Sequence, residues 1–312
     1  MITNKLPKVE KKLLFLLICF ILFYILFDKI KFNKTHIIDL KEKIYFDKYE
    51  VDKYLEIKEK LLNNKCSDMW LNQREFLNGI IRKFKPHKFL EIGVNRGGSS
   101  IIILNAIKDI KDSKLYSIDL NDKKNIGYCV NKFFPELSKK WKLYTGNIAT
   151  EFLEEIGKNI DMAFIDTAHY EPGEILDFLI ILPFLREKAV VIFHDIANQI
   201  TKSKNRREWA PYIIFNAIRG HNFFPSGNFL IKNDIGAKQL EINQKNYYHD
   251  YFRLLGGQWQ YFPKEKHIIQ IRKFFKKYYD EDCLTMFEEA SSFNKLFVKN
   301  NPAKLIYNFT SD

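Results

Sequence analysis

The stretch Lys88-Phe-Leu-Glu-Ile-Gly-Val-Asn-Arg-Gly-Gly-Ser-Ser100 decides the fold. It opens with a short apolar run just after Pro86, which predicts a buried strand. Gly93, Gly97 and Gly98 end that strand. An apolar periodic segment over 99–110 then predicts a helix. Because glycines let a ligand approach the backbone and helix N-termini point free amides at it, the stretch predicts a strand, a ligand-binding turn and a helix.

The spacing of these glycines indicates the kind of ligand. A dinucleotide-binding turn has the order Gly-x-Gly-x-x-Gly, in which the middle glycine admits the pyrophosphate. Asn95 stands at that middle position, so NAD is disfavoured. The order Glu-x-Gly-x-x-x-Gly-Gly, which starts at Glu91, instead resembles motif I of class I S-adenosylmethionine-dependent methyltransferases. The alternative is an ordinary βα turn with glycines. The resemblance implies that S-adenosylmethionine binds along Glu91, Gly93, Asn95, Gly97, Gly98 and Ser99.

Apolar strands alternate with helical segments beyond this turn. Further strands are predicted over 114–120, 141–145, 159–166 and 189–195, with helices over 126–134, 149–157 and 174–182 between them. Five strands that alternate with helices predict a parallel, doubly wound α/β sheet. A terminal hairpin of 229–232 and 235–242, which the methyltransferase resemblance requires, would complete a mostly parallel seven-stranded sheet of the Rossmann-like methyltransferase fold.

Polar residues follow the strands of this predicted sheet, at the ends where ligands bind in such folds. Asp119 follows Gly98 by 21 positions, about the distance at which a carboxylate meets the ribose hydroxyls in a βαβ nucleotide site. A carboxylate can accept a hydrogen bond from each of two neighbouring hydroxyls. A strand-end Asp that only opens a turn is the alternative. Asn147, after the third strand, is a further cofactor-binding candidate.

Two later segments carry a finer resemblance. Phe164-Ile-Asp-Thr-Ala-His-Tyr170 and Val191-Ile-Phe-His-Asp195 are similar to the metal-dependent O-methyltransferase branch and its relatives among cell-surface and antibiotic tailoring enzymes, over roughly residues 70–245. The resemblance implies that Asp166 and Asp195 hold a divalent metal such as Mg²⁺. It also places His169 where the branch often has a lysine base, and imidazole can take a hydroxyl proton near neutral pH. His169 and Asp166 are therefore the catalytic candidates.

The chain departs from this branch at two positions. Ile196 replaces the Asn that commonly follows the second Asp, and it cannot bind a metal. His194 stands where some relatives have an acidic residue, and magnesium prefers oxygen ligands. Magnesium dependence is therefore left open. A structural hydrogen bond is the alternative role for His169 and His194.

The resemblance implies O-methylation of a small-molecule or sugar hydroxyl, with a cell-surface glycan or its precursor as acceptor. Methyltransferases that act on nucleic-acid amino groups usually carry Asn/Asp-Pro-Pro-aromatic after the fourth strand, where this chain has Asp166-Thr-Ala-His169. A nucleic-acid partner is therefore disfavoured. Two alternatives stay open: a membrane-tethered binding protein that keeps the fold without catalysis, and a relative that uses the same sheet for oxidation.

Charge and cysteine content limit the remaining classes. The 312-residue chain carries 50 Lys and Arg against 38 Asp and Glu, a formal net charge of +12. This charge would attract anionic partners, but it is spread along the chain and is interpreted as solvated surface. The four cysteines lie far apart without a Cys-x-x-Cys spacing, so neither a zinc site nor a disulfide framework is expected. This pattern of cysteines favours a protein in a reducing compartment. The cysteines are Cys19, Cys66, Cys129 and Cys283.

An uninterrupted apolar run over 13–27 predicts a single membrane anchor. Such a helix spans about 22 Å of a bilayer core of about 30 Å, but lysines on both sides can reach the interfaces. A buried helix and a cleaved signal peptide are the alternatives, although no small-x-small cleavage site follows the run. Lysines are in excess after the run, which favours a cytoplasmic main domain.

These features predict four segments. Residues 1–34 form the anchor, 35–66 a linker with helical stretches, 67–263 the methyltransferase domain and 264–312 a helical C-terminal extension. A helix between Ser67 and Pro86 is expected to cover the sheet or, by analogy with methyltransferases, to lid the cofactor pocket.

Overall fold

The computed structural model describes residues 48–196, 210–225 and 234–300, and their side chains from residue 54 to residue 297. They belong to one compact unit, Phe46–Asp312. The predicted membrane anchor over 13–27 lies outside the described residues. Among the helices that are described, none is both long enough and apolar enough to cross a membrane.

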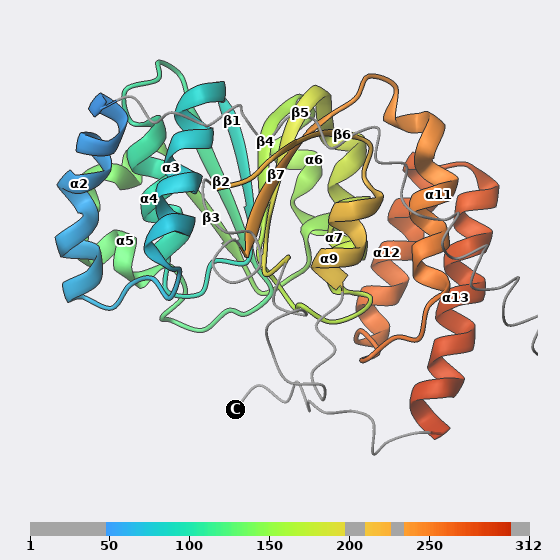
Figure 1. The fold of residues 1–312 in the computed structure, drawn as a ribbon. Helices are drawn as coiled ribbons and strands as arrows, with labels where there is room; N and C mark the ends of the chain where they lie inside the picture. Colours follow the sequence, from blue (N-terminus) through green and yellow to red (C-terminus); the bar gives the residue numbers. More distant parts are fainter. Residues whose placement is uncertain (1–47, 197–209, 226–233, 301–312) are drawn as a thin grey trace, which may run out of the picture. The chain divides into compact units, whose positions relative to one another are not determined.

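A seven-stranded sheet in the order β3-β2-β1-β4-β5-β7-β6 forms the centre of this unit (Figure 1). β7 is antiparallel to both of its neighbours, and the other strand pairs are parallel. The predicted doubly wound, mostly parallel seven-stranded sheet is therefore confirmed. Its strands are β1 (Lys88–Ile92), β2 (Lys114–Asp119), β3 (Trp141–Thr145), β4 (Ile160–Ile165), β5 (Leu185–His194), β6 (Gly220–Phe223) and β7 (Ile235–Leu240).

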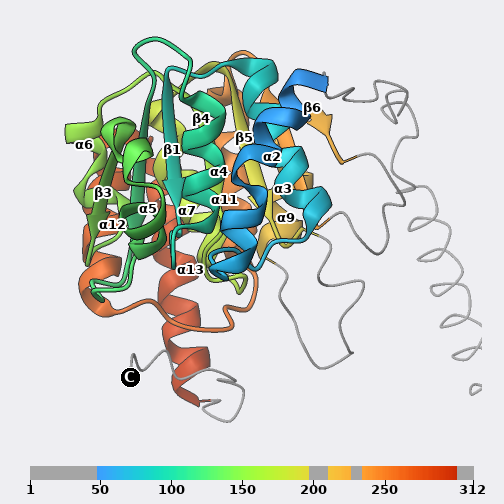
Figure 2. The same cartoon turned by 90° about the vertical axis from the view of Figure 1, so that its left-hand side faces the viewer.

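Helices cover both faces of the sheet. The face turned to the viewer in Figure 2 carries α2 (Lys48–Asn63), α3 (Leu71–Phe84), α4 (Gly98–Ile107) and α5 (Tyr128–Phe133). The opposite side, on the right in Figure 1, carries α6 (Leu153–Ile156), α7 (Gly173–Ile181), α9 (Ala210–Ala217), α11 (Tyr248–Arg253), α12 (Glu265–Tyr278) and α13 (Glu281–Asn300).

The position of each helix follows from where its apolar residues lie. Ile101, Ile102 and Ile103 of α4 are fully buried, because the helix is enclosed by β2, α2 and α3. A helix that is apolar on every side needs such an enclosure. α12 instead borders solvent, and it presents only one apolar stripe, including Ile271 and Phe275, to the core.

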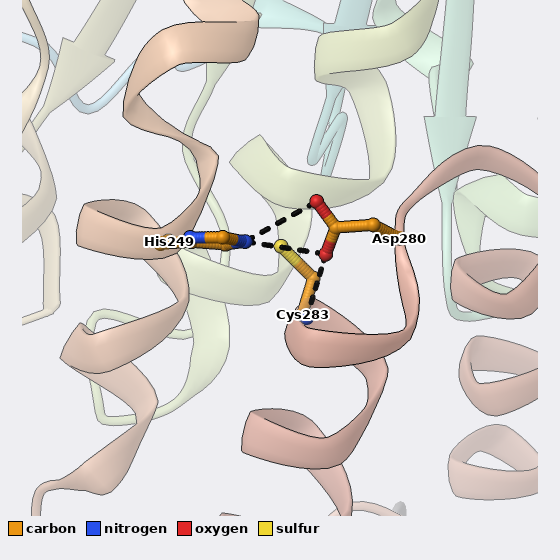
Figure 3. A group of neighbouring side chains, drawn as sticks. All are labelled: His249, Asp280 and Cys283. Carbon is orange, nitrogen blue, oxygen red and sulfur yellow. Dashed lines mark hydrogen bonds and ion pairs between the residues drawn. The ribbon is translucent and has the colours of Figure 1, made fainter.

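The C-terminal helices extend the core on the α7 side. Phe275 of α12 meets Phe252 of α11 and Phe287 of α13 edge to face, with ring centroids 4.9 and 5.1 Å apart. His249 of α11 faces Asp280, which directly precedes α13 (Figure 3). The predicted helical C-terminus is confirmed for α12 and α13, and both helices pack into the same core as the sheet.

The last strand of the sheet, β7, begins at Ile235 as expected. It pairs with β5 on one side and with β6 on the other. The other predicted half of its hairpin, 229–232, lies outside the described residues, and β6 was not predicted. β6 is too short and too polar to show the apolar alternation by which strands are recognised.

Candidate active site

A cleft of about 1470 Å³ opens at the carboxyl ends of the parallel strands. Small-molecule pockets usually measure about 300–1,000 Å³, so this cleft has room for a cofactor and an acceptor together. Of the predicted site residues, Glu91 and Gly97 lie outside its lining. The lining contains Gly93, Asn95, Gly98, Ser99, Asp119, Asn147, Asp166, His169, His194 and Asp195.

Asp119, at the end of β2, holds in place the segment between β1 and α4, residues 93–97, which is called the glycine loop below. Its Oδ2 accepts hydrogen bonds from the amides of Val94 and Asn95, both at 3.0 Å. Its Oδ1 accepts one from the amide of Asn121 at 2.9 Å. The side chain is only 7% exposed, yet it lines the cleft. The side-chain Nδ2 of Asn121 also donates to Oδ1, at 3.3 Å. Because each carboxylate oxygen has two lone pairs, a ribose hydroxyl can donate to Oδ1 in place of the Asn121 side chain while Asp119 still holds the loop.

Gly93 allows the glycine loop to touch the end of β4. Its φ is +89°, and a Cβ at this position would lie 1.8 Å from the carbonyl oxygen of Asp166. Only glycine fits such a backbone contact. The contact places the predicted cofactor loop directly beside the predicted catalytic residues.

Glu91 supports the loop from beneath and does not contact the cleft. It is fully buried in β1, and the hydroxyls of Ser99, Ser100 and Ser117 donate to its carboxylate at 2.6 to 2.7 Å. Burial raises the pKa of Glu91 to about 7, against the effect of these hydrogen bonds. Two of the serines belong to the first turn of α4. Glu91 therefore fixes the N-terminus of α4 against β1 and β2.

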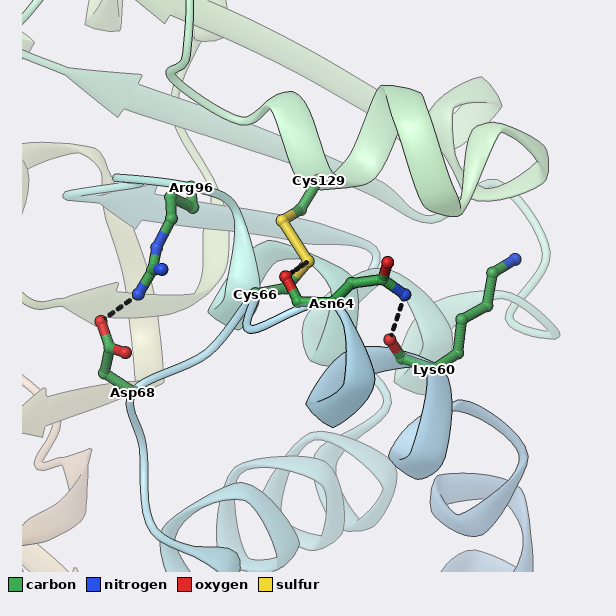
Figure 4. The surroundings of a disulfide bond; sticks show 6 residues. All are labelled: Lys60, Asn64, Cys66, Asp68, Arg96 and Cys129. Carbon is green, nitrogen blue, oxygen red and sulfur yellow. Dashed lines mark hydrogen bonds and ion pairs between the residues drawn. A yellow bond between two sulfur atoms is a disulfide. The ribbon is translucent and has the colours of Figure 1, made fainter.

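The segment between α2 and α3, residues 64–70, covers the N-terminus of α4 and is called the cover loop below (Figure 4). A Cβ on Gly98 would lie 2.3 Å from the carbonyl oxygen of Cys66. Asp68 of the cover loop pairs with Arg96 of the glycine loop at 2.5 Å. The helix predicted between Ser67 and Pro86 is α3, which follows the cover loop in the chain. The cover loop lines the cleft.

A disulfide joins Cys66 of the cover loop to Cys129 of α5 (Figure 4). The expectation of no disulfide is therefore wrong, and with it goes the argument for a reducing compartment, because disulfides persist in oxidising surroundings. The two cysteines are 63 positions apart. They meet because α5 is tied to the glycine loop, with the Cys129 amide donating to the Arg96 carbonyl at 3.0 Å. The spacing of the cysteines in the sequence does not indicate this contact.

Removal of this disulfide by Cys129→Ser is expected to lower the free energy of unfolding by about 2–4 kcal/mol. It should also weaken S-adenosylhomocysteine (SAH) binding about tenfold, because the cover loop is no longer held over the cleft. Urea unfolding and calorimetric titration measure the two effects. A reductant should reproduce both in the wild type and add nothing in Cys129→Ser; a wild-type protein indifferent to full reduction would contradict the prediction.

Two aspartates and two histidines from the ends of β4 and β5 converge in the cleft. His169 Nε2 lies 3.2 Å from Asp195 Oδ2 and 3.9 Å from Asp166 Oδ1. His194 Nδ1 lies 3.2 Å from the same Asp195 oxygen and 3.6 Å from Asp166 Oδ1. His169 and Asp195 have φ angles of +60° and +57°. Such angles are rare outside glycine and cluster at functional sites.

Burial and charge oppose each other in this cluster. Burial lowers the pKa of His169, but the carboxylates of Glu174, Asp195 and Asp166 outweigh it and raise that pKa to about 9. Burial also lowers the pKa of His194, but the carboxylates of Asp166 and Asp195 outweigh it and raise that pKa well above the usual value. Against burial, the two imidazoles hold the pKa of Asp195 well below its usual range. The aspartate charge is thus stabilised in the cleft.

Glu174, in the first turn of α7, orients His169 and is not apparent from the sequence. Its Oε1 accepts a hydrogen bond from the His169 amide at 2.6 Å and lies 3.5 Å from His169 Nδ1. The Glu174 side chain is 1% exposed. This arrangement leaves Nε2 of His169 facing Asp166 and Asp195. An acidic residue in a first helical turn usually only complements the helix dipole, so its role could not be predicted.

The part of the chain that contains the cleft strands is similar to a known family. Residues 90–196 match the family model described as a methyltransferase domain. No curated protein sequence is detectably similar to the chain.

Among solved structures, the chain resembles an O-methyltransferase from Bacillus cereus in complex with SAH, at 16% identity over 60% of this chain and 90% of that one, with a TM-score of 0.46. It also resembles the O-methyltransferase TomG from Streptomyces achromogenes, involved in tomaymycin synthesis and in complex with SAM, at 17% identity over 62% and 91%, with a TM-score of 0.44.

The part of the chain that matches a methyltransferase domain, residues 90–196, thus contains the glycine loop, Asp119 and the ends of β4 and β5. The methyltransferase resemblance of the sequence motifs is confirmed at this level.

Proposed function

We propose that the protein is an S-adenosylmethionine-dependent O-methyltransferase. One cleft contains both the glycine loop braced by Asp119 and the cluster around His169, and this observation carries the proposal. Asp119 Oδ1, from which a ribose hydroxyl would displace the Asn121 side chain, and the absence of a Cβ at Gly93 and Gly98 fit a bound adenosyl ribose and its tail. The contact of Gly93 with Asp166 brings the two halves of the cleft together.

S-adenosylmethionine, when bound, supplies a methyl group already activated on a sulfonium. The protein contributes positioning and proton transfer. His169 Nε2 accepts the proton of the acceptor hydroxyl while the methyl–sulfur bond breaks and the methyl–oxygen bond forms. Glu174 orients the ring from its Nδ1 side, and Asp166 and Asp195 stabilise the resulting imidazolium.

The acceptor we propose is a sugar hydroxyl on a cell-surface glycan or its precursor, presented to a protein that is anchored in the membrane by residues 13–27. Trp70, which is 74% exposed, lines the cleft together with Tyr261 and Phe262. Flat aromatic faces with a polar handle suit the mixed apolar and polar surface of a sugar ring.

The function is tested with methyl-labelled S-adenosylmethionine and a panel of sugar and phenolic hydroxyl acceptors. Transfer of label to a hydroxyl, lost in His169→Ala, supports the proposal. Tight SAH binding without transfer to any acceptor would contradict it and favour a non-catalytic binding protein with the same fold.

The cluster also has donors for a divalent cation. Donors at right angles around an ion at about 2.1 Å lie roughly 3 Å apart, close to the 3.2 and 3.6 Å between His194 Nδ1 and the oxygens of Asp195 and Asp166. Neither ring nitrogen of His194 has a hydrogen-bond partner among the described residues. A cation held by these three residues would supply a Lewis acid toward the acceptor oxygen. Because imidazole suits transition ions, the donors fit Mn²⁺, Fe²⁺ or Zn²⁺ better than the Mg²⁺ expected from the resemblance.

Mn²⁺ is therefore expected to bind at least about tenfold more tightly than Mg²⁺. His194→Glu makes the donor set all oxygen and should reduce this preference. The electron paramagnetic resonance signal of free Mn²⁺ falls as the ion binds, so titration with and without Mg²⁺ as competitor measures both affinities. Asp195→Asn is the control variant, which should bind neither ion. The same Mn²⁺ preference in wild type and His194→Glu would remove His194 from the ligand set.

A further inference from the structure

A second group of metal-ligating side chains lies among the C-terminal helices, outside the lining of the cleft. His249 belongs to α11, Asp280 directly precedes α13, and Cys283 lies in the first turn of α13 (Figure 3). His249 Nε2 lies 3.3 and 3.2 Å from the two carboxylate oxygens of Asp280. Each of the three residues offers a ligand atom within 4.8 Å of the others.

The arrangement differs from that of a catalytic triad. In a triad the two ring nitrogens of the histidine face different partners. Here Nε2 alone faces the carboxylate, and Figure 3 shows the imidazole edge, the carboxylate and the thiol directed at one common point. The side chain of Cys283 is also fully buried, which excludes it as a nucleophile for a bulky substrate.

The donor types indicate which ion would fit. One imidazole nitrogen, one carboxylate oxygen and one sulfur are the ligands that Zn²⁺ takes at about 2.0–2.3 Å. Around a tetrahedral ion such donors lie roughly 3.3–3.8 Å apart, so the His249–Asp280 pair is already in place and the sulfur needs to move by about 1 Å at most. His249 and Asp280 are 43% and 57% exposed, which opens the group to solvent and to a water as fourth ligand.

We propose that His249, Asp280 and Cys283 bind a Zn²⁺ ion that links α11 to the turn between α12 and α13. Binding forms a zinc–sulfur bond and releases the thiol proton to solvent, so no oxidant or reductant is needed. The cation also offsets the cost of a thiolate beside Asp280, where burial and the neighbouring carboxylate raise the pKa of Cys283 to about 12. The site stabilises the C-terminal helices that pack on α7.

A purely structural role for the same residues makes a different prediction. Asp280 Oδ1 accepts a hydrogen bond from the Cys283 amide at 2.9 Å and so caps α13. Asn caps helices as well as Asp does, but it lacks the charge that a zinc ligand needs. Asp280→Asn therefore separates the two roles, because it keeps the cap and removes the anionic ligand.

The experiment uses the full chain with Asp195→Asn, which silences the proposed cation site in the cleft. Zn²⁺ affinity is measured by competition with a chromogenic chelator, and Co²⁺ is used as a spectroscopic probe because a cobalt–thiolate bond gives a near-ultraviolet charge-transfer band. Asp250→Asn, on the same helix as His249, is the matched control. Its carboxylate is 56% exposed and pairs with Arg253.

The proposal predicts one Zn²⁺ per chain, a cobalt–thiolate band and a higher melting temperature with Zn²⁺. Zn²⁺ affinity should fall about tenfold or more in Cys283→Ser and Asp280→Asn, and stay unchanged in Asp250→Asn. Metal-free Asp280→Asn should melt at the wild-type temperature, which shows that the cap is intact. Zn²⁺ affinity that is unaffected by both substitutions, or a Co²⁺ complex without the thiolate band, would overturn the proposal.

Discussion

Asp119→Ala is expected to weaken SAH binding by about a hundredfold or more. The substitution removes the acceptor proposed for the ribose hydroxyls, and it releases the amides of Val94 and Asn95 that hold the glycine loop. Hydrogen bonds to a charged group contribute about 1.5–3 kcal/mol each. Because about 2.8 kcal/mol corresponds to a hundredfold change in Kd, the loss of two such bonds accounts for the effect.

Calorimetric titration with SAH measures this loss, with thermal unfolding as a check that the variant is folded. Asp122→Ala is the matched control, since Asp122 is an exposed carboxylate in the lining of the same cleft. Asp122→Ala should bind SAH as the wild type does. Equal affinities of wild type and Asp119→Ala would show that the cofactor is not held at the end of β2.

His169→Ala is expected to reduce turnover by about a hundredfold or more and to leave SAH affinity unchanged. The imidazole is the group that takes the acceptor proton, and its Nε2 faces Asp195 and Asp166, whereas the glycine loop is held by Asp119. Single-turnover methyl transfer with saturating S-adenosylmethionine isolates the chemical step. His87→Ala, at the amino end of β1, is a control histidine remote from the strand ends that form the cleft.

The pH dependence of turnover gives a second readout for His169. A base acts only in its deprotonated form, and the surrounding carboxylates raise the pKa of His169 to about 9. Without added metal, turnover should therefore rise with pH up to about 9 and then level off. A cation bound to Asp166 and Asp195 would stabilise the neutral imidazole and shift this rise to lower pH. A near-normal rate in His169→Ala with the same pH profile would exclude it as the base.

The sheet could be predicted because its strands are local signals. β1, β2, β4 and β5 are apolar runs bounded by glycine, proline or polar residues. A polar side chain ends or directly follows β2, β4 and β5, and glycine follows β1. In a parallel sheet these ends meet at one edge, so the placement of Asp119, Asp166 and Asp195 in one cleft follows from topology.

The remaining contacts depend on packing between distant segments. The Cys66–Cys129 disulfide requires α5 to lie against the glycine loop, which no residue spacing shows. Glu91 resembles a ligand-binding residue in the sequence, but three serines from two elements enclose it. Asp119 carries a loop-bracing role in addition to the predicted ribose role, because its carboxylate meets amides that the loop leaves without strand or helix partners.

The central claim, that the cleft binds S-adenosylmethionine, is tested most directly by calorimetric titration of the purified full chain with SAH. The structure predicts one saturable site per chain and a rise in melting temperature on binding. No heat of binding and no thermal shift in a demonstrably folded protein would contradict the claim. That result would leave a methyltransferase fold used for another purpose.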